Sequence, residues 1–322
     1  MRAIVVKSPG GPEVLELGEV PDPRPGPGDL LVRVRAAGVN RADLLQRMGR
    51  YPPPPGEPET LGLEIAGEVL EPAAPFRRGD RVMALLGGGA YAELARAPAV
   101  QAMPIPEGMS FAEAAAIPEA FLTSWLNLFL LGRLSPGEVV VVHAAASGVG
   151  SAALQLCRGV ATTVLATASP AKLAACLELG ATHVLARQDV PAGLADALRS
   201  AAGRGADLIF DPVGASYLEA NVQALALQGR LCCISTMGGS KATLDLGALL
   251  TRRLTVMGSM LRSRSVAQKA KLVADFSRNS LPRFAKGELR PVLGRTYPLA
   301  QAREAHAALE RNEVVGKIAL LV

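Results

Sequence analysis

The sequence has few cysteines, and their spacing gives no sign of a disulfide-stapled scaffold. The four cysteines are Cys157, Cys176, Cys232 and Cys233, with no C-x-x-C pair among them. Because Cys232 and Cys233 are adjacent, they would point to opposite faces of a strand. We read all four as reduced thiols in a protein core. A chain of 322 residues is long enough for two domains with large buried cores.

Long apolar runs are also scarce. The N-terminus, MRAIVVKSPGG, lacks the apolar stretch of a signal peptide. The most apolar later run, FLTSWLNLFLLG, is too short and too polar to span a bilayer. We therefore expect a soluble, cytoplasmic protein with no membrane partner.

Aromatic residues are few, and this bears on the positive charge of the chain. A net charge of +5 raises the question of nucleic acid, because clustered arginines attract phosphates. The arginines are scattered, however, and the four tyrosines leave little for base stacking. A solvated basic surface is the better interpretation, and nucleic acid is not the expected partner.

The pattern of predicted secondary structure differs between two regions of the chain. Residues 1–118 contain short strands broken by Gly and Pro, with one helix-like insert, NRADLLQRMG. From Glu138 onward six apolar strands alternate with helices, which predicts an α/β domain with a doubly wound parallel sheet. Since six strands complete such a sheet, the tail should return to the first domain. We expect one domain over 1–118 and 266–322, and a second over 119–265.

The first strand of the alternating region leads into a turn of small residues, VVVVHAAASGVGSAALQL. Dinucleotide-binding turns usually read G-x-G-x-x-G, but here Ala145 and Ser147 replace the first two glycines. Gly150 matches the third, and Gly148 is an extra one. Because alanine and serine are nearly as small as glycine, the helix N-terminus can still approach a pyrophosphate, and Val149 lies within the same turn.

Several motifs, spread over the whole chain, together resemble those of one family. They are GGPEVLEL, NRADLLQRMGRYPPP, LGLEIAGEV, GDRVMALL, AAAIPEAFLT, DPVG, GSMLRSR and GKIALLV. The chain resembles the zinc-independent quinone oxidoreductase branch of the medium-chain dehydrogenase/reductase superfamily, and within it the tumour-suppressor-inducible quinone oxidoreductases. The resemblance implies a GroES-like, mostly β catalytic domain and a Rossmann nucleotide-binding domain, with the active site in the cleft between them.

The region after the second strand of the alternation bears on the cofactor. An NAD-binding protein usually has a carboxylate there for the ribose hydroxyls, but the first one here, Glu178, lies well inside the next helix. Ser169, Lys172 and Arg187 could instead receive a 2′-phosphate, so NADPH is expected. By resemblance, Ala168 and Lys172 contact that phosphate, whereas Arg187 stands where the family usually has tyrosine. Alternatively, Ser169 is only a helix cap and Lys172 a surface lysine.

No metal site is expected. Zinc-dependent relatives use a cysteine and a G-H-E triplet, because Zn²⁺ binds thiolate and imidazole. This chain has Asn40 in place of the cysteine and Leu63 in place of the histidine. The three histidines, His143, His183 and His306, are too dispersed to form a site.

Without a metal, the reaction must rely on the cofactor, and hydride transfer to a quinone fits because that acceptor is already electrophilic. Candidate lining residues are Asn40, Asp43, Tyr51, Thr123 and the loop that begins at Ser235. By resemblance, Asn40, Tyr51 and Thr123 lie near the nicotinamide. The same resemblance assigns cofactor or substrate contacts to Met260, Leu261 and Arg262.

Two other functions stay open. The spacing from Asn40 to Tyr51 also matches related enoyl-thioester reductases, in which the tyrosine donates a proton to carbon. The chain could also be an NADPH-binding module that binds RNA. In any of these cases the apolar strand LTVMGSM, 254–260, should form an open sheet edge that pairs two copies into a homodimer, as in the family.

Overall fold

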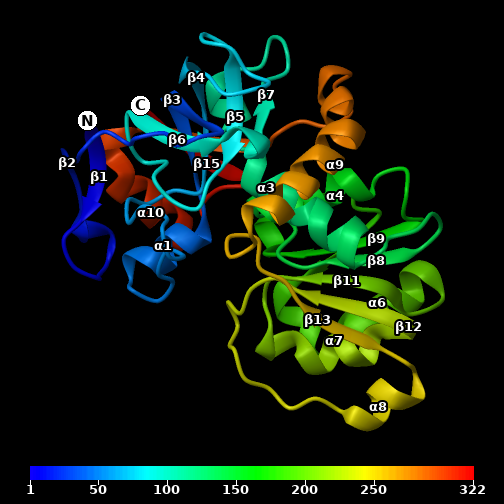
Figure 1. Ribbon diagram of the computed structural model, residues 1–322. Coiled ribbons are helices and arrows are strands. Elements are labelled where there is room, and N and C mark those ends of the chain that lie inside the picture. Colours follow the sequence, from blue (N-terminus) through cyan, green and yellow to red (C-terminus); the bar gives the residue numbers. More distant parts are fainter. The chain divides into compact units, whose positions relative to one another are not determined.

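The computed structural model describes all residues, 1–322, and divides into two compact units (Figure 1). The first unit combines Met1–Leu122 with Leu261–Val322, and the second is Thr123–Met260. The C-terminal segment Leu261–Val322 thus belongs to the first unit. The boundaries between the units differ by a few residues from the expected 118 and 265. At the first boundary, helix α3, Pro118–Trp125, continues from one unit into the other.

The first unit is built on a mostly antiparallel sheet with the strand order β14-β15-β3-β4-β5-β7, and β6 also pairs with β3. A separate hairpin joins β1 and β2. The strands are β1 (Arg2–Val6), β2 (Leu15–Glu19), β3 (Asp29–Val39), β4 (Glu64–Glu71), β5 (Arg81–Leu85), β6 (Leu94–Pro98), β7 (Ala102–Pro104), β14 (Leu293–Pro298) and β15 (Lys317–Leu321).

The helices of the first unit include the inserted helix α1, which follows β3 as the sequence predicts. The helical segments are η1 (Pro12–Val14), α1 (Arg41–Arg47), η2 (Ala99–Gln101), α2 (Phe111–Ala114), α9 (Val266–Ala285), η7 (Leu299–Gln301) and α10 (Ala302–Glu310). At α2 a capping box is present, because Ser110 accepts from the Glu113 amide and Glu113 accepts from the Ser110 amide. The apolar faces of β3, β4, β15 and α10 form the core of this unit.

The second unit contains the predicted doubly wound sheet. All six strands are parallel, in the order β10-β9-β8-β11-β12-β13. They are β8 (Val139–Val142), β9 (Thr163–Ala168), β10 (His183–Ala186), β11 (Ala206–Asp211), β12 (Leu225–Cys233) and β13 (Thr255–Gly258). Because the strands are parallel, the carboxyl ends of β8, β9, β11 and β12 share one edge of the sheet. The chain order reverses between the central strands β8 and β11.

The connecting segments of the second unit are largely helical. They are η3 (Leu126–Leu131, a π-helix), α4 (Gly148–Cys157), η4 (Pro170–Lys172), α5 (Leu173–Glu178), η5 (Arg187–Asp189), α6 (Val190–Ala202), η6 (Ala215–Tyr217), α7 (Leu218–Ala224) and α8 (Leu246–Thr251). The four cysteines form no disulfide. Cys232 is buried and its neighbour Cys233 is half-buried, as expected for alternating positions on β12.

One helical run is longer than the sequence suggests. Residues 111–131 form 21 residues of helix with a mean hydropathy of 1.4, which is long and apolar enough to cross a membrane by length and composition alone. The stretch consists of α2, α3 and η3, with a turn at 115–117 between the first two. About two thirds (67%) of this window is buried inside the protein, as in a core helix.

Candidate functional site

In the first unit, three strands bring polar residues together at one end of the sheet. Val39, at the end of β3, pairs with Ile318 of the antiparallel β15, and Ala37 pairs with Ile65 of β4. The residues next to these pairs are Asn40, Lys317 and Glu64. They lie side by side although they are far apart in the chain.

Asn40 is held by a buried ion pair. Its Nδ2 donates to Glu64 Oε1 at 2.9 Å, and its Oδ1 accepts from Lys317 Nζ. Lys317 Nζ also lies 2.6 Å from Glu64 Oε1 and donates to the Val39 carbonyl at 2.9 Å. Glu64 is fully buried and Lys317 nearly so. The Asn40 side chain makes no helix-cap hydrogen bond, because both ends of its carboxamide are bound to these two charges.

Glu64 fits into this place because β3 carries a glycine opposite it. A Cβ at Gly38 would lie 2.2 Å from Glu64 Oε1 and 2.5 Å from the Ala115 carbonyl. The second carboxylate oxygen of Glu64 accepts the backbone N–H of Glu119 at 2.8 Å. The Glu64 carboxylate is therefore held by the Asn40 amide, the Lys317 ammonium and the Glu119 backbone N–H.

Asp43, on the first turn of α1, connects Asn40 to a second buried network. Its Oδ2 accepts the Asn40 backbone N–H at 2.7 Å and the Tyr91 hydroxyl at 3.0 Å. Tyr91 Oη lies 3.1 Å from His306 Nε2, and His306 Nδ1 lies 3.3 Å from Arg47 Nη1. Since a guanidinium only donates, His306 accepts at Nδ1 and donates from Nε2.

The charges of this network follow from burial. Burial lowers the pKa of His306 to about 3, with a further decrease from Arg47, so the ring is neutral. Burial raises the pKa of Asp43 to about 6, although the Asn40 amide and Lys317 act in the opposite direction. Burial and Asp43 together raise the pKa of Tyr91 well above its usual value. At neutral pH the hydrogen bonds therefore run in one direction, from Arg47 to an ionised Asp43.

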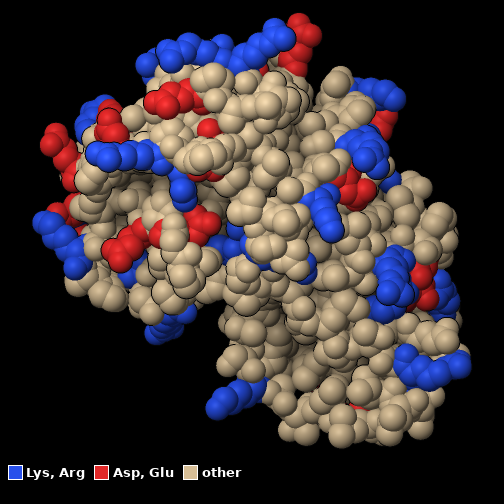
Figure 2. Space-filling view, viewed as in Figure 1, with Lys and Arg blue, Asp and Glu red and all other residues tan.

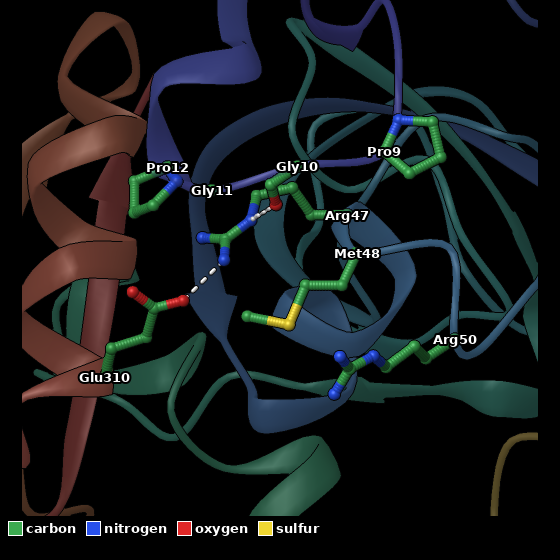
Figure 3. A pocket seen from close by; sticks show the side chains of 8 residues that line it. All are labelled: Pro9, Gly10, Gly11, Pro12, Arg47, Met48, Arg50 and Glu310. Atoms are coloured by element: carbon green, nitrogen blue, oxygen red, sulfur yellow. Dashed lines mark hydrogen bonds and ion pairs between the residues drawn. The ribbon is translucent and has the colours of Figure 1, made fainter.

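Arg47 also lines a surface pocket of about 380 Å³ (Figure 3). Its guanidinium points to Glu310 of α10 and to the Gly10 carbonyl, to which Nε donates at 3.0 Å. Met48 and Arg50 line the same pocket. The Arg47 guanidinium is therefore already bound by the Gly10 carbonyl, His306 and Glu310.

Tyr51 follows α1 and is supported by Arg262. The guanidinium of Arg262 lies 5.2 Å from the Tyr51 ring centroid and donates to the Tyr51 carbonyl at 3.4 Å. It also donates to Gln46 Oε1 and the Gly87 carbonyl. The Tyr51 side chain is half-buried and its hydroxyl makes no hydrogen bond. Arg262 therefore holds the loop that carries this tyrosine.

Thr123, the third predicted catalytic residue, belongs to the second unit. Its Oγ1 is buried without a hydrogen-bond partner, while its carbonyl accepts from Asn127 Nδ2 at 2.8 Å. The structure thus brings Asn40 and Asp43 into one network, with Tyr51 elsewhere in the same unit. Met260 ends the second unit and is 51% exposed, whereas Leu261 begins the returning segment and is buried.

The predicted pyrophosphate turn lies between β8 and α4. Ala145 donates its N–H to the Thr167 carbonyl at 2.9 Å, and Ser147 caps α4 by accepting the Gly150 N–H at 3.1 Å. A Cβ at Gly150 would lie 2.5 Å from the Ala144 carbonyl, so only glycine fits there. Ala144 itself has a φ of 47°. Glycine is therefore required at Gly150, where helix α4 contacts strand β8. Gly148 and Val149 form the first turn of α4.

The predicted 2′-phosphate residues follow neighbouring strands. Ala168 of β9 is in register with Ala186 of β10, so Ser169 and Arg187, the next residues, leave the same sheet edge. Ser169 makes no side-chain cap bond, and its carbonyl accepts the Lys172 N–H at 2.9 Å. No carboxylate lies between Ala168 and Glu178. Ser235 follows β12 at this edge, close to the turn after β11.

A buried network also fixes the carboxyl edge of this sheet. His143 lies 2.9 Å from Thr167 Oγ1 and 2.7 Å from Asn221 Oδ1. Asn221 donates to Asp211, whose Oδ1 accepts the Val213 N–H at 2.6 Å. Burial lowers the pKa of His143, which makes it a satisfied neutral core residue.

The donor set does not fit a metal. No group of three or more His, Cys, Asp or Glu side chains is arranged to hold an ion. Around Asn40 the side chains are an amide, a buried leucine and an ammonium group, and the ammonium of Lys317 already neutralises Glu64. These side chains do not supply the thiolate and imidazole ligands with which zinc-dependent relatives bind the metal.

Figure 2 shows the charged side chains on one face of the molecule. On the face drawn in Figure 2, lysine and arginine side chains are spread over the surface with carboxylates among them, and several adjoin along the upper rim. Ion pairs such as Arg2 with Glu93 and Arg295 with Glu313 contribute to this pattern.

Several buried and half-buried polar residues of the first unit are not foreseen from the sequence: Glu64, Tyr91, Glu119, Lys269, His306 and Lys317. The only local signal is a charged residue beside an apolar run, as in GKIALLV for Lys317 and IPEAFLT for Glu119. A charge at the start of a buried strand or helix indicates that a partner is present but does not identify it.

Comparison with known proteins agrees with both units. Residues 26–107 match the alcohol dehydrogenase GroES-like domain, and residues 148–276 match the zinc-binding dehydrogenase family. The whole chain is 33% identical to the human synaptic vesicle membrane protein VAT-1 homolog, of which 86% is covered. It is 32% identical to the quinone oxidoreductase of Rattus norvegicus, of which 98% is covered.

Comparison with solved structures finds the same two-domain fold. A mycobacterial protein in complex with NADPH is 29% identical, with a TM-score of 0.90 and both chains covered in full. The fold thus defines an oxidoreductase with a GroES-like domain and a Rossmann-like parallel sheet. The chain belongs to the medium-chain dehydrogenase/reductase superfamily, in its quinone oxidoreductase branch.

Proposed function

We propose that this oxidoreductase transfers hydride from NADPH to a quinone without a metal ion. The observation that carries the proposal is the network of Asn40, Glu64 and Lys317, in which Lys317 neutralises the only carboxylate and which contains no thiolate or imidazole. An acceptor reduced here needs no Lewis acid, and a quinone is electrophilic enough by itself. The similarity to the rat quinone oxidoreductase supports the same acceptor class.

Three features support NADPH as the cofactor. The turn from Ala145 to Gly150 has the close helix–strand contact that a pyrophosphate site needs. Lys172 and Arg187 leave neighbouring strands of one sheet edge without a carboxylate beside Ala168. The similarity to a protein solved with NADPH is consistent with this choice.

The roles of the chain's own residues follow from their surroundings. When bound, the cofactor would supply hydride. The network fixes Asn40 as a rigid amide, and Arg262 orients the loop of Tyr51. The apolar helix α3 carries Thr123, whose buried hydroxyl has no protein partner. We further propose a cytoplasmic location, supported by the burial of most of the apolar run 111–131.

A second reaction, the reduction of an activated C=C bond, is favoured by one observation. The Tyr51 hydroxyl is half-buried and has no hydrogen-bond partner, as a proton donor awaiting its substrate would be. In that reaction the proton must reach carbon, so a placed donor is required.

A panel of acceptors tested with both cofactors decides between these functions. We expect steady NADPH oxidation with ortho-quinones, slower oxidation with NADH, and little with enals. Faster turnover of enals would favour the alkene reductase. Salt-sensitive binding of RNA that NADPH displaces, without turnover of any acceptor, would instead identify a nucleotide-binding module.

A further inference from the structure

One amide hydrogen of Asn40 has no partner in the protein. A carboxamide nitrogen carries two hydrogens, and Asn40 Nδ2 uses one of them to donate to Glu64 Oε1 at 2.9 Å. Its second hydrogen makes no hydrogen bond within the protein. Because the residue is half-buried rather than enclosed, this hydrogen can bond to a ligand.

The other polar groups in the cluster of Asn40, Glu64 and Lys317 are already used. Lys317 Nζ has three hydrogens, and its three partners are the Val39 carbonyl, Asn40 Oδ1 and Glu64 Oε1. Glu64 Oε2 accepts the Glu119 N–H at 2.8 Å. Asn40 Nδ2 therefore carries the one donor hydrogen that this cluster leaves unused.

Lys317 makes this N–H a stronger donor than that of an ordinary amide. Its ammonium binds Oδ1 and so polarises the carboxamide, which increases the positive charge on the amide hydrogens. The same contacts fix the orientation of the side chain. Rotation that exchanged Oδ1 with Nδ2 would place the amide nitrogen against the ammonium, and both of these groups only donate.

The backbone of Asn40 is fixed as well. Its N–H donates to Asp43 Oδ2 at 2.7 Å, and the Tyr91 hydroxyl donates to the same oxygen at 3.0 Å. His306 Nε2 lies 3.1 Å from Tyr91 Oη. Because the side chains of Asp43, Tyr91 and His306 are fully buried, Asn40 needs little reorganisation when a ligand binds.

We propose that Asn40 Nδ2 donates its second hydrogen to the acceptor oxygen that becomes negative, and that Lys317 is a positioning residue that polarises this amide. This inference rests on the proposed function. Hydride adds two electrons and one hydrogen to the quinone and leaves a hydroquinone monoanion, whose oxyanion the Asn40 N–H stabilises. A proton taken from solvent then forms the second O–H bond. Each hydroquinone consumes one NADPH and one proton.

The first test compares quinone turnover in Asn40→Ala, Asn40→Asp and the control Asn312→Asp. Both Asn40 variants should lower kcat by about 10²- to 10³-fold at unchanged NADPH affinity, because a donor to the developing oxyanion is lost. Asn312 is an exposed amide whose Oδ1 accepts from Arg41, a contact that a carboxylate keeps, so Asn312→Asp should behave like the parent. A change in KM alone, with kcat unchanged, would overturn the oxyanion role.

A second measurement does not depend on turnover. The probe is para-nitrophenol, whose ionisation is visible by absorbance and which stands in for the hydroquinone anion in the NADP⁺-loaded enzyme. The parent should lower the pKa of the bound phenol by about one unit, because a hydrogen-bond donor favours the charged form, and Asn40→Ala should not. The double variant Lys317→Met with Glu64→Gln removes both charges of the ion pair and should give a smaller shift than the parent.

The outcomes separate the parts of the inference. A parent that leaves the ionisation of para-nitrophenol unchanged, or an Asn40→Ala variant that shifts it as much as the parent does, would overturn the donor role of Asn40. An undiminished shift in the double variant would overturn the polarising role of Lys317 alone. Failure of the parent to reduce any quinone would overturn the proposed function, and the phenol measurement would still decide whether Asn40 binds an oxyanion.

Discussion

Lys317 both neutralises a buried carboxylate and orients a neighbouring side chain. Its ammonium neutralises the fully buried Glu64 and orients Asn40 through the same contact. A buried pair of this kind adds little net stability by itself, but removing one partner leaves an uncompensated charge.

Lys317→Met should therefore lower the free energy of unfolding by about 3–5 kcal/mol, as measured by urea denaturation. The matched control is Lys7→Met, since Lys7 pairs with Glu16 on the surface and should contribute less than about 1 kcal/mol. Similar losses for the two variants would show that Glu64 is not charged. The double variant Lys317→Met with Glu64→Gln should recover much of the stability.

Lys172 is the residue that most directly tests the cofactor. Lys172→Ala should weaken NADPH binding by about 1–3 kcal/mol, because a charge-assisted bond to phosphate is lost, and should leave NADH binding nearly unchanged. Fluorescence titration with both cofactors measures the difference, with Lys241→Ala as an exposed control in the same unit. Equal losses for both cofactors would contradict the phosphate contact.

Tyr51 separates the two proposed reactions. With a quinone, Tyr51→Phe should change turnover by less than about tenfold, because another acid or solvent can protonate an oxyanion. With an enoyl substrate the same change should cost about 10²- to 10⁴-fold, since the proton must be delivered to carbon. Tyr297→Phe serves as the control. A loss beyond a hundredfold with the best quinone, at unchanged NADPH affinity, would favour the alkene reductase.

Secondary structure elements were predictable where the signal is local. The six strands of the parallel sheet and the turn before α4 follow from apolar runs and from glycine at Gly148 and Gly150, which are properties of neighbouring residues. The buried networks were not predictable, because Asn40 and Lys317 are 277 residues apart and Tyr91 and His306 are 215 apart. Only the pairing of strands brings such residues together.

Gly150 provides a test at the level of a single turn. A Cβ there would meet the Ala144 carbonyl at 2.5 Å and Ala145 Cα at 2.6 Å, so Gly150→Ala must push α4 away from β8. We expect a loss of about 1–3 kcal/mol in unfolding free energy, together with weaker NADPH binding.

The control for this change is Gly193→Ala in α6, where an added Cβ meets nothing within 4 Å. Since glycine is a poor residue for a helix interior, this variant should gain up to about 1 kcal/mol. If Gly150→Ala were as stable as Gly193→Ala in thermal unfolding, the close contact of α4 with β8 would not be required.

At the scale of the whole molecule, one edge of the six-stranded sheet is unpaired. β13 lies at the edge of the six-stranded sheet and is hydrogen-bonded only to β12. Val256 on this strand is 37% exposed, and Leu246 and Leu250 of the preceding α8 are 62% and 75% exposed. An apolar edge that is both unpaired and exposed favours association with another strand.

We propose that two copies pair through β13 about a two-fold axis, which would continue the sheet across both subunits. Light scattering at micromolar concentration should then give the mass of a dimer. Val256→Lys should shift it toward the monomer, because a charge on the edge strand opposes pairing, whereas Leu177→Lys, an exposed apolar position on α5, should stay dimeric. A monomer in the unaltered protein would show that the edge is left open. A dimer insensitive to Val256→Lys would place the interface on a different surface.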